Sequence, residues 1–275
     1  MEVLFAQKRR VRNPVGAGMF YPDDKAELLN VLRSFNLENG RSGHAKAIIA
    51  PHGAWKYSGA LAADAFSAAM GRTGIKRVVI LGPIHDKREK GIFLSNSHSF
   101  NTPIGNILVD RKISEKFEEA GDSIEINDIP HLGEHSIEIL LPFVKYCFPN
   151  ASIVPVLMGQ PGAQYIIDLA NALKTVITPV IDETLIVVSC NLSYNDDERT
   201  ARLTAEEALR LFAEKNAPAL ASAILEGSLS ACGGALVVSL FESGIIENTS
   251  ASMNDLVSAV SAENSVVFYN SLSYQ

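Results

Sequence analysis

Histidine side chains, which bind metals and transfer protons, follow two short apolar runs in this chain. His52 comes after residues 47–50 and Pro51, and His85 comes shortly after residues 78–81. Neutral imidazole is the commonest metal ligand in proteins, and a rigid strand end gives the precision that coordination requires. Two histidines at equivalent strand ends therefore predict a shared site, although a single loop histidine is more often solvated.

Cys232 is a further candidate, because it precedes Gly233, Gly234 and a predicted helix. A thiol at a helix N-terminus has a lowered pKa and suits soft metals or redox chemistry. The alternative is that Cys232 packs as a small hydrophobic residue, as free cysteines often do. Cys147 and Cys190 lie in apolar stretches, and we interpret both as packing residues.

His131, Glu134 and His135 lie close together, but their spacing is not that of a zinc-protease helix. A glutamate at a helix start can also simply compensate the helix dipole, so a site role for Glu134 or His135 stays open. Asn191 and Tyr194 follow a third apolar run, 185–188. Both can hydrogen-bond a ligand, and neither is a good metal ligand.

The elements that must position these residues are strands alternating with helices. Residues 47–50, 78–81 and 184–188 predict buried strands, and helical segments follow 47–50 and 184–188, whereas two more strands are expected over 92–109 after 78–81. Without linkers or repeats, this pattern predicts a single three-layer α/β/α domain over residues 1–275 with a mostly parallel, mixed central sheet. Ligands bind such sheets at the carboxyl ends of their strands.

Three further segments give more specific expectations. Pro155 predicts that strand 153–157 lies at an edge of the sheet, because proline is poorly tolerated in central strands. Residues 127–135 are predicted to form a loop, and 265–269 a last strand. The basic run 8–12 is interpreted as a solvated edge.

Composition excludes several classes of protein. A net charge of −7 offers no basic face for nucleic acid. No apolar run reaches the roughly 18–20 residues of a membrane span, and residues 1–6 do not resemble a signal peptide. Three cysteines form no disulfide framework, which favours a reducing, cytoplasmic setting. Nucleotide-binding glycine loops and the serine-hydrolase elbow are absent from the sequence.

Several motifs in the same order resemble the Memo family, also called AmmeMemoRadiSam system protein B. This family is similar in fold to the LigB-type catalytic subunit of class III extradiol ring-cleaving dioxygenases. The resemblance covers nearly the whole chain. Its motifs are Arg12-x-Pro14-Val15-x-x-Gly18-x-Phe20-Tyr21-Pro22, Ala50-Pro51-His52 through Tyr57-Ser58-Gly59, Leu81-Gly82-Pro83-x-His85, Glu134-His135-Ser136-Ile137-Glu138 with Leu141-Pro142, and Cys232-Gly233.

The resemblance implies a metal site of two histidines and a cysteine, with an aspartate and a histidine from a Ser-Asp-x-Ser-His loop. His52, His85 and Cys232 stand at the matching positions, whereas Asn191 and Tyr194 replace the aspartate and the second histidine. The motifs also place Glu134, His135, Trp55 and Tyr57 at the pocket.

Two functions follow as expectations. In the first, His52, His85 and Cys232 hold Fe(II) or Cu(I), and a redox or dioxygenase-like reaction uses His135, or alternatively Tyr194, as acid/base. A cysteine in place of the carboxylate of class III dioxygenases argues against ring cleavage. In the second, Asn191 and Tyr194 leave the site metal-free, and the chain is a non-catalytic binding protein. The resemblance implies an AMMECR1-like protein and a radical SAM protein as partners.

Overall fold

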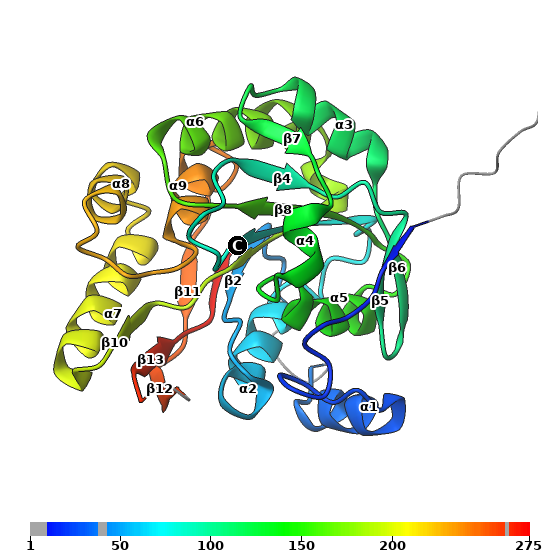
Figure 1. Cartoon of the computed structure of the whole chain (residues 1–275), viewed down its shortest axis with the longest axis horizontal. Helices are drawn as coiled ribbons and strands as arrows, with labels where there is room; N and C mark the ends of the chain where they lie inside the picture. Colours follow the sequence, from blue (N-terminus) through cyan, green and yellow to red (C-terminus); the bar gives the residue numbers. More distant parts are fainter. Residues whose placement is uncertain (1–9, 38–42, 262–263) are drawn as a thin grey trace, which may run out of the picture.

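A mixed sheet of eight strands forms the middle of the computed structural model, which describes residues 10–37, 43–261 and 264–275 (Figure 1). The strand order is β11-β14-β2-β9-β3-β8-β4-β7. Their bounds are β2 (Ala47–Ala50), β3 (Arg77–Pro83), β4 (Ile92–Leu94), β7 (Ile124–Ile126), β8 (Ser152–Met158), β9 (Thr184–Ser189), β11 (Ala251–Met253) and β14 (Leu272–Tyr274).

The four central strands β2, β9, β3 and β8 are parallel, so their carboxyl ends meet at one edge. Ala50 at the end of β2 pairs with Ser189 at the end of β9. Strands β14 and β4 run antiparallel to β2 and β8. The predicted mixed, mostly parallel sheet is confirmed.

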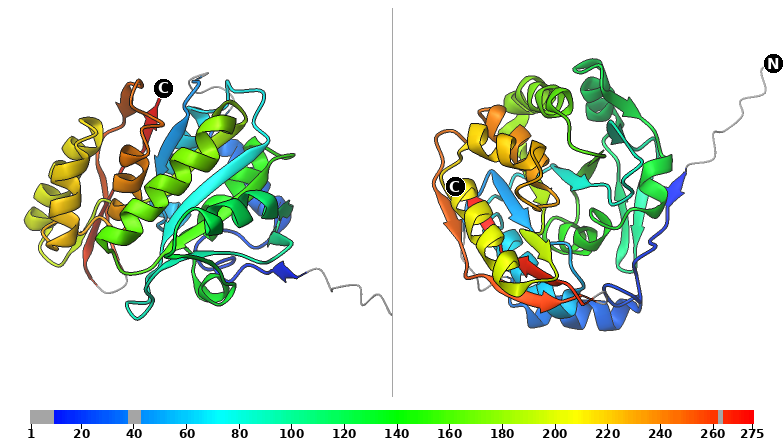
Figure 2. Two further views of the ribbon diagram at one scale, coloured as in Figure 1. Left: turned by 90° about the horizontal axis from the view of Figure 1, so that it is seen from above. Right: turned by 60° about the vertical axis from the view of Figure 1, so that its left-hand side comes forward.

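Side chains of the central strands point alternately into two apolar layers, as the period of two along a strand requires. Ile49 and Val79 pack on one side, and Ile48 and Val78 on the other. Helices cover both faces (Figure 2). The layer that contains Ile49 and Val79 is covered by α3 (Arg111–Glu119), α6 (Ala163–Ala172), α7 (Glu198–Ala213), α8 (Ala217–Leu225) and α9 (Gly234–Glu242). The layer that contains Ile48 and Val78 is covered by α1 (Lys25–Ser34), α2 (Trp55–Ser67) and α5 (Leu141–Cys147).

Shorter elements complete the chain. Strands β1 (Val11–Arg12), β5 (Ser99–Thr102) and β6 (Gly105–Leu108) form one small sheet, and β10 (Ser193–Asn195), β13 (Val266–Tyr269) and β12 (Val257–Val260) form another. Helix α4 (Ile129–Gly133) and the helical turns η1 (Glu138–Leu140), η2 (Leu173–Ile177) and η3 (Thr178–Glu183) make up the rest. None of the helices in the described ranges is long and apolar enough to cross a membrane.

The structure corrects three expectations. Strand β8 lies between β3 and β4 rather than at an edge; the β4 ladder covers only 156–158, so Pro155 is paired on one side alone. The segment 127–135 contains α4, which has Pro130 in its first turn. The strand at 265–269 is β13 of a small sheet, and β14 beyond it pairs with β2.

Candidate metal centre

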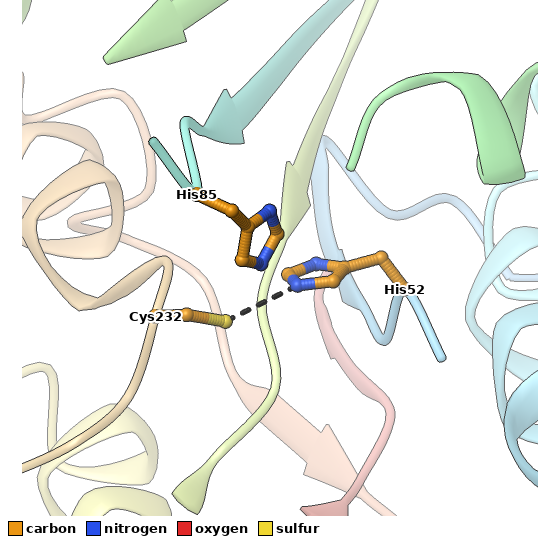
Figure 3. A group of neighbouring side chains, drawn as sticks. All are labelled: His52, His85 and Cys232. Atoms are coloured by element: carbon orange, nitrogen blue, oxygen red, sulfur yellow. Dashed lines mark hydrogen bonds between the residues drawn. The ribbon is translucent and has the colours of Figure 1, made fainter. Parts of the chain in front are cut away.

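Three side chains from distant parts of the sequence meet at the carboxyl edge of the central strands (Figure 3). His52 follows β2, His85 follows β3, and Cys232 precedes α9. One ligand atom from each lies within 4.8 Å of the other two. The Cys232 Sγ is 3.3 Å from His52 Nε2, and the two imidazole centroids are 5.2 Å apart. The structure thus brings together the three residues that the sequence singled out.

Hydrogen bonds fix the orientation of His52. The Ser189 hydroxyl donates to the Ser136 carbonyl at 2.7 Å, so it can only accept from His52 Nδ1, also at 2.7 Å. The Nδ1 atom therefore carries a proton and Nε2 faces Cys232. Nε2 lies at hydrogen-bonding distance from the sulfur, 3.3 Å, and a metal ion bound by both atoms would take the place of a proton between them.

Glu134 fixes His85 in the same way. Its carboxylate accepts the His85 backbone N–H at 2.8 Å and contacts His85 Nδ1 at 3.0 Å, which leaves Nε2 for a ligand. Burial disfavours a charge on His85, but hydrogen bonds to Cys232 and Glu134 outweigh it and raise the His85 pKa to about 10. For Glu134, burial is likewise outweighed by the His85 contacts, which lower the pKa to about 2.

The sulfur of Cys232 lies among groups that favour its ionised form. The Asn191 backbone N–H points at Sγ from 3.2 Å. A hydrogen bond from Cys190 lowers the pKa of the Cys232 thiol well below its usual range; burial opposes this effect, and the charge of His52 adds to it. A thiolate beside two imidazoles is a donor set that soft and borderline metal ions prefer.

His135 adds a third imidazole beside the three donors. Its ring stacks between Phe20, at 4.7 Å, and His85, at 4.6 Å, and lies 6.2 Å from the His52 ring. Burial lowers the pKa of His135 to about 4; Glu134 opposes the shift, and His85 adds to it. His135 is therefore neutral near pH 7. His85, Glu134 and His135 form a second group of possible ligands.

The other residues predicted to line the pocket lie at different distances from this centre. Asn191 takes part directly, because its Oδ1 accepts the His52 backbone N–H at 3.0 Å. Tyr194 lies on β10 with 45% of its surface exposed. Trp55 is buried against Phe143 and donates to a backbone carbonyl, and Tyr57 is 41% exposed.

A pocket of about 630 Å³ is lined by Phe20, Trp55 and Tyr57, among others. Phe20 belongs both to this lining and to the stack on His135. Trp55 and Tyr57 thus line a pocket, and Phe20 connects it to the His135 side of the centre.

Sequence reasoning missed a buried ion pair behind the centre. Arg12, interpreted as part of a solvated run, is only 3% exposed and pairs with Glu138. It also donates to the backbone carbonyls of Glu134, at 2.8 Å, and of His131, at 3.0 Å. The solvated interpretation is wrong for Arg12, because the N–H groups of a buried guanidinium need acceptors, which here come from the folded chain. Residues 8 and 9 of the run lie outside the described residues.

Glu138 holds the N-terminal segment in place. Its carboxylate accepts the backbone N–H groups of Val15 and Gly16 and the Tyr21 hydroxyl, the last at 2.9 Å. The buried His131 likewise serves the structure, since its Nε2 pairs with the Phe93 carbonyl. Arg12 and Glu138 each belong to one of the sequence motifs, but no local pattern could have paired them, because they are 126 positions apart and meet only in the folded chain.

Tyr269 is a further neighbour that the sequence did not single out. Its hydroxyl lies against Gly53, where a Cβ would come within 2.8 Å of it. Burial raises the pKa of Tyr269 to about 12, and the negative charge of the nearby Cys232 adds a smaller effect in the same direction. Gly53 next to His52 is therefore required for close packing rather than for a special backbone angle.

Fold and site together define an α/β/α protein with a His-His-Cys cluster at its strand ends. The chain matches the family model described as "Memo-like protein" over residues 12–273 and belongs to that family. Proteins similar to this chain, each called a MEMO1 family protein, include examples from three organisms. Those of Methanobrevibacter smithii (30% identity; 70% of this chain and 73% of that protein), Methanothermobacter thermautotrophicus (27%; 87% and 90%) and Thermotoga petrophila (28%; 81% and 84%) align over most of their length.

Proposed function

We propose that this chain binds a single Fe(II) or Cu(I) ion through His52, His85 and Cys232. The observation that carries the proposal is the convergence of one donor atom from each residue within 4.8 Å. Two imidazoles and a thiolate suit these borderline and soft ions better than they suit Mg²⁺ or Ca²⁺, which prefer oxygen. Ser189 and Glu134 each hold one imidazole ring through Nδ1, which leaves Nε2 of both rings available to a metal ion, as in a preorganised metal site.

A redox or dioxygenase-like reaction is the activity we propose for the loaded site. When bound, either ion would supply one-electron redox chemistry. The chain itself would contribute His135 as a proton acceptor, because its neutral ring stacks on His85 and is held by Glu134. Tyr194, on the strand after the Asn191 loop, is the second acid/base candidate. We place this chemistry in a reducing, cytoplasmic setting, where free cysteines persist.

The test is an anaerobic titration of Fe(II) or Cu(I) into the wild-type protein and into His52→Ala. We expect micromolar or tighter binding that is lost in His52→Ala. His44→Ala is the matched control, because His44 is exposed and lies outside the cluster, and it should bind as the wild type does. Binding that survives in His52→Ala would refute the proposed ligand set.

The second candidate function is a metal-free binding protein. It is favoured by Asn191 and Tyr194, which remove a carboxylate and an imidazole from the site that the family resemblance implies. An AMMECR1-like protein and a radical SAM protein are the partners we propose for it. Absence of Fe(II) and Cu(I) binding in the wild type, together with co-purification of either partner at a stable ratio, would favour this function over the first.

A further inference from the structure

Cys190 lies directly behind the sulfur of the metal cluster. It follows β9 and is fully buried. The Asn191 carbonyl oxygen lies 3.3 Å from the Cys190 Sγ and 3.6 Å from the Cys232 Sγ. Both sulfur atoms therefore lie against the same carbonyl oxygen at the carboxyl edge of the sheet.

The backbones that carry the two cysteines are also in contact. The Cys232 N–H donates to the Asn191 carbonyl at 3.2 Å. A Cβ built on Gly233 would lie 2.7 Å from the Cys190 Cβ and 2.4 Å from the Ser189 carbonyl oxygen. A side chain at residue 233 would thus force these two segments apart, and glycine lets them approach. A disulfide needs Cβ atoms about 3.5–4.5 Å apart, a separation that such closely packed segments can provide.

We propose that Cys190 and Cys232 are a modification site: in the metal-free protein a peroxide converts them to an intramolecular disulfide. The Cys232 thiolate attacks a peroxide oxygen, the O–O bond breaks, and hydroxide (or an alkoxide) leaves behind a sulfenic acid. The Cys190 sulfur then attacks the Cys232 sulfur, the S–O bond breaks, and the sulfenic oxygen leaves as water with the Cys190 proton. Two electrons pass from the sulfurs to the peroxide.

The order of these steps follows from exposure. Cys232 is partly exposed, whereas Cys190 is fully buried, so the oxidant reaches Cys232 and Cys190 resolves the product. The remaining cysteine, Cys147, is at the end of α5 on the second apolar layer, apart from this pair. The disulfide consumes the sulfur of the proposed metal site; this consequence rests on the proposed function, whereas the disulfide itself does not.

The test uses the full chain, reduced, stripped of metal by a chelator, and treated with a small excess of hydrogen peroxide. We expect free thiols to fall from three to one per chain, and peptide mapping without reduction to link Cys190 to Cys232. Cys147→Ser, the matched control, should form the same link. Cys190→Ser should form none and should accumulate sulfenic or sulfinic acid on Cys232, detected by mass. Cys190→Ala, checked by circular dichroism, repeats this arm if the serine variant unfolds.

Three results would overturn the proposal. They are the absence of a 190–232 disulfide in the folded wild type, a disulfide through Cys147 instead, and a loss of as many thiols per chain in Cys190→Ser as in the wild type. Fe(II) or Cu(I) binding is then measured on the reduced and oxidised wild type. Binding by the reduced form that disappears on oxidation and returns with a reductant supports both proposals. A 190–232 disulfide in a chain that binds no metal even when reduced supports the modification site and refutes the proposed metal site.

Discussion

Glu134 is the residue whose substitution tests most directly whether the site is prepared for a metal. Its two carboxylate oxygens contact His85 Nδ1 and accept the backbone N–H groups of His85, His135 and Ser136, at 2.7–3.0 Å. In Glu134→Gln one oxygen becomes an NH₂ group. If the remaining oxygen takes the more crowded Oε1 position, it keeps the contact with His85 Nδ1, but the NH₂ group faces the His85 backbone N–H. His85 then loses its charge partner and one of the two hydrogen bonds that hold it in place.

Loss of such a supporting carboxylate lowers metal affinity by about 10- to 100-fold, which is about 1.4–2.7 kcal/mol. The assay is anaerobic competition with a chromophoric Cu(I) chelator at neutral pH, after circular dichroism has confirmed the fold. Glu125→Gln, an exposed carboxylate on β7, is the control and should leave the affinity unchanged. A folded Glu134→Gln variant with wild-type affinity would refute the positioning role.

Three other changes test the wider network. Replacing both Asn191 and Tyr194, by Asp and His respectively, should raise Fe(II) affinity by about tenfold or more, because it restores a negative charge and an imidazole; equal affinity in the same competition assay would be contrary to this reasoning. Glu138→Gln should lower the free energy of unfolding in urea by about 3–5 kcal/mol, because Arg12 stays buried without its charge partner, and a loss below about 1 kcal/mol would count against it. Burial lowers the pKa of His131 from 6.5 to about 4, so the unfolded chain binds the proton first as pH falls. The contribution of neutral His131 to the free energy of unfolding should therefore be complete above pH 6.5, and this free energy should fall by up to about 3 kcal/mol toward pH 4. The fall should be shallower in His131→Gln; parallel pH profiles of the two proteins would show that His131 is not the cause.

The parts of the fold that the sequence predicted are those where local pattern and tertiary position agree. Residues 47–50, 78–81 and 184–188 are apolar on both faces, and they are the central parallel strands β2, β3 and β9. Because each strand ends in a turn that carries a polar side chain, the sequence alone assigns His52, His85 and Asn191 to one edge of the sheet.

The errors fall where a distant contact overrides a local rule. Pro155 suggested an edge strand, but β8 is a central strand. It tolerates the proline because β4 pairs with β8 only at residues 156–158, so residue 155 has no strand partner on that side. Arg12 has the composition of a solvated tail, and only its pairing with Glu138 buries it. Cys190 does pack in the core, as its apolar neighbours predict, but the carbonyl oxygen that it shares with Cys232 is a tertiary contact, which no local pattern could reveal.

The position of β14 has a consequence for how this chain folds. Residues 272–274 form the strand that shields β2, the carrier of His52, so the two partners are separated by more than two hundred positions. While the chain emerges from the ribosome, β2 has an open flank from the time it is made until β14 arrives. Contacts of such long sequence separation form slowly, and an uncovered strand invites pairing with other chains. Folding helpers that mask nascent strands should therefore matter more for this chain than for α/β proteins closed by neighbouring segments.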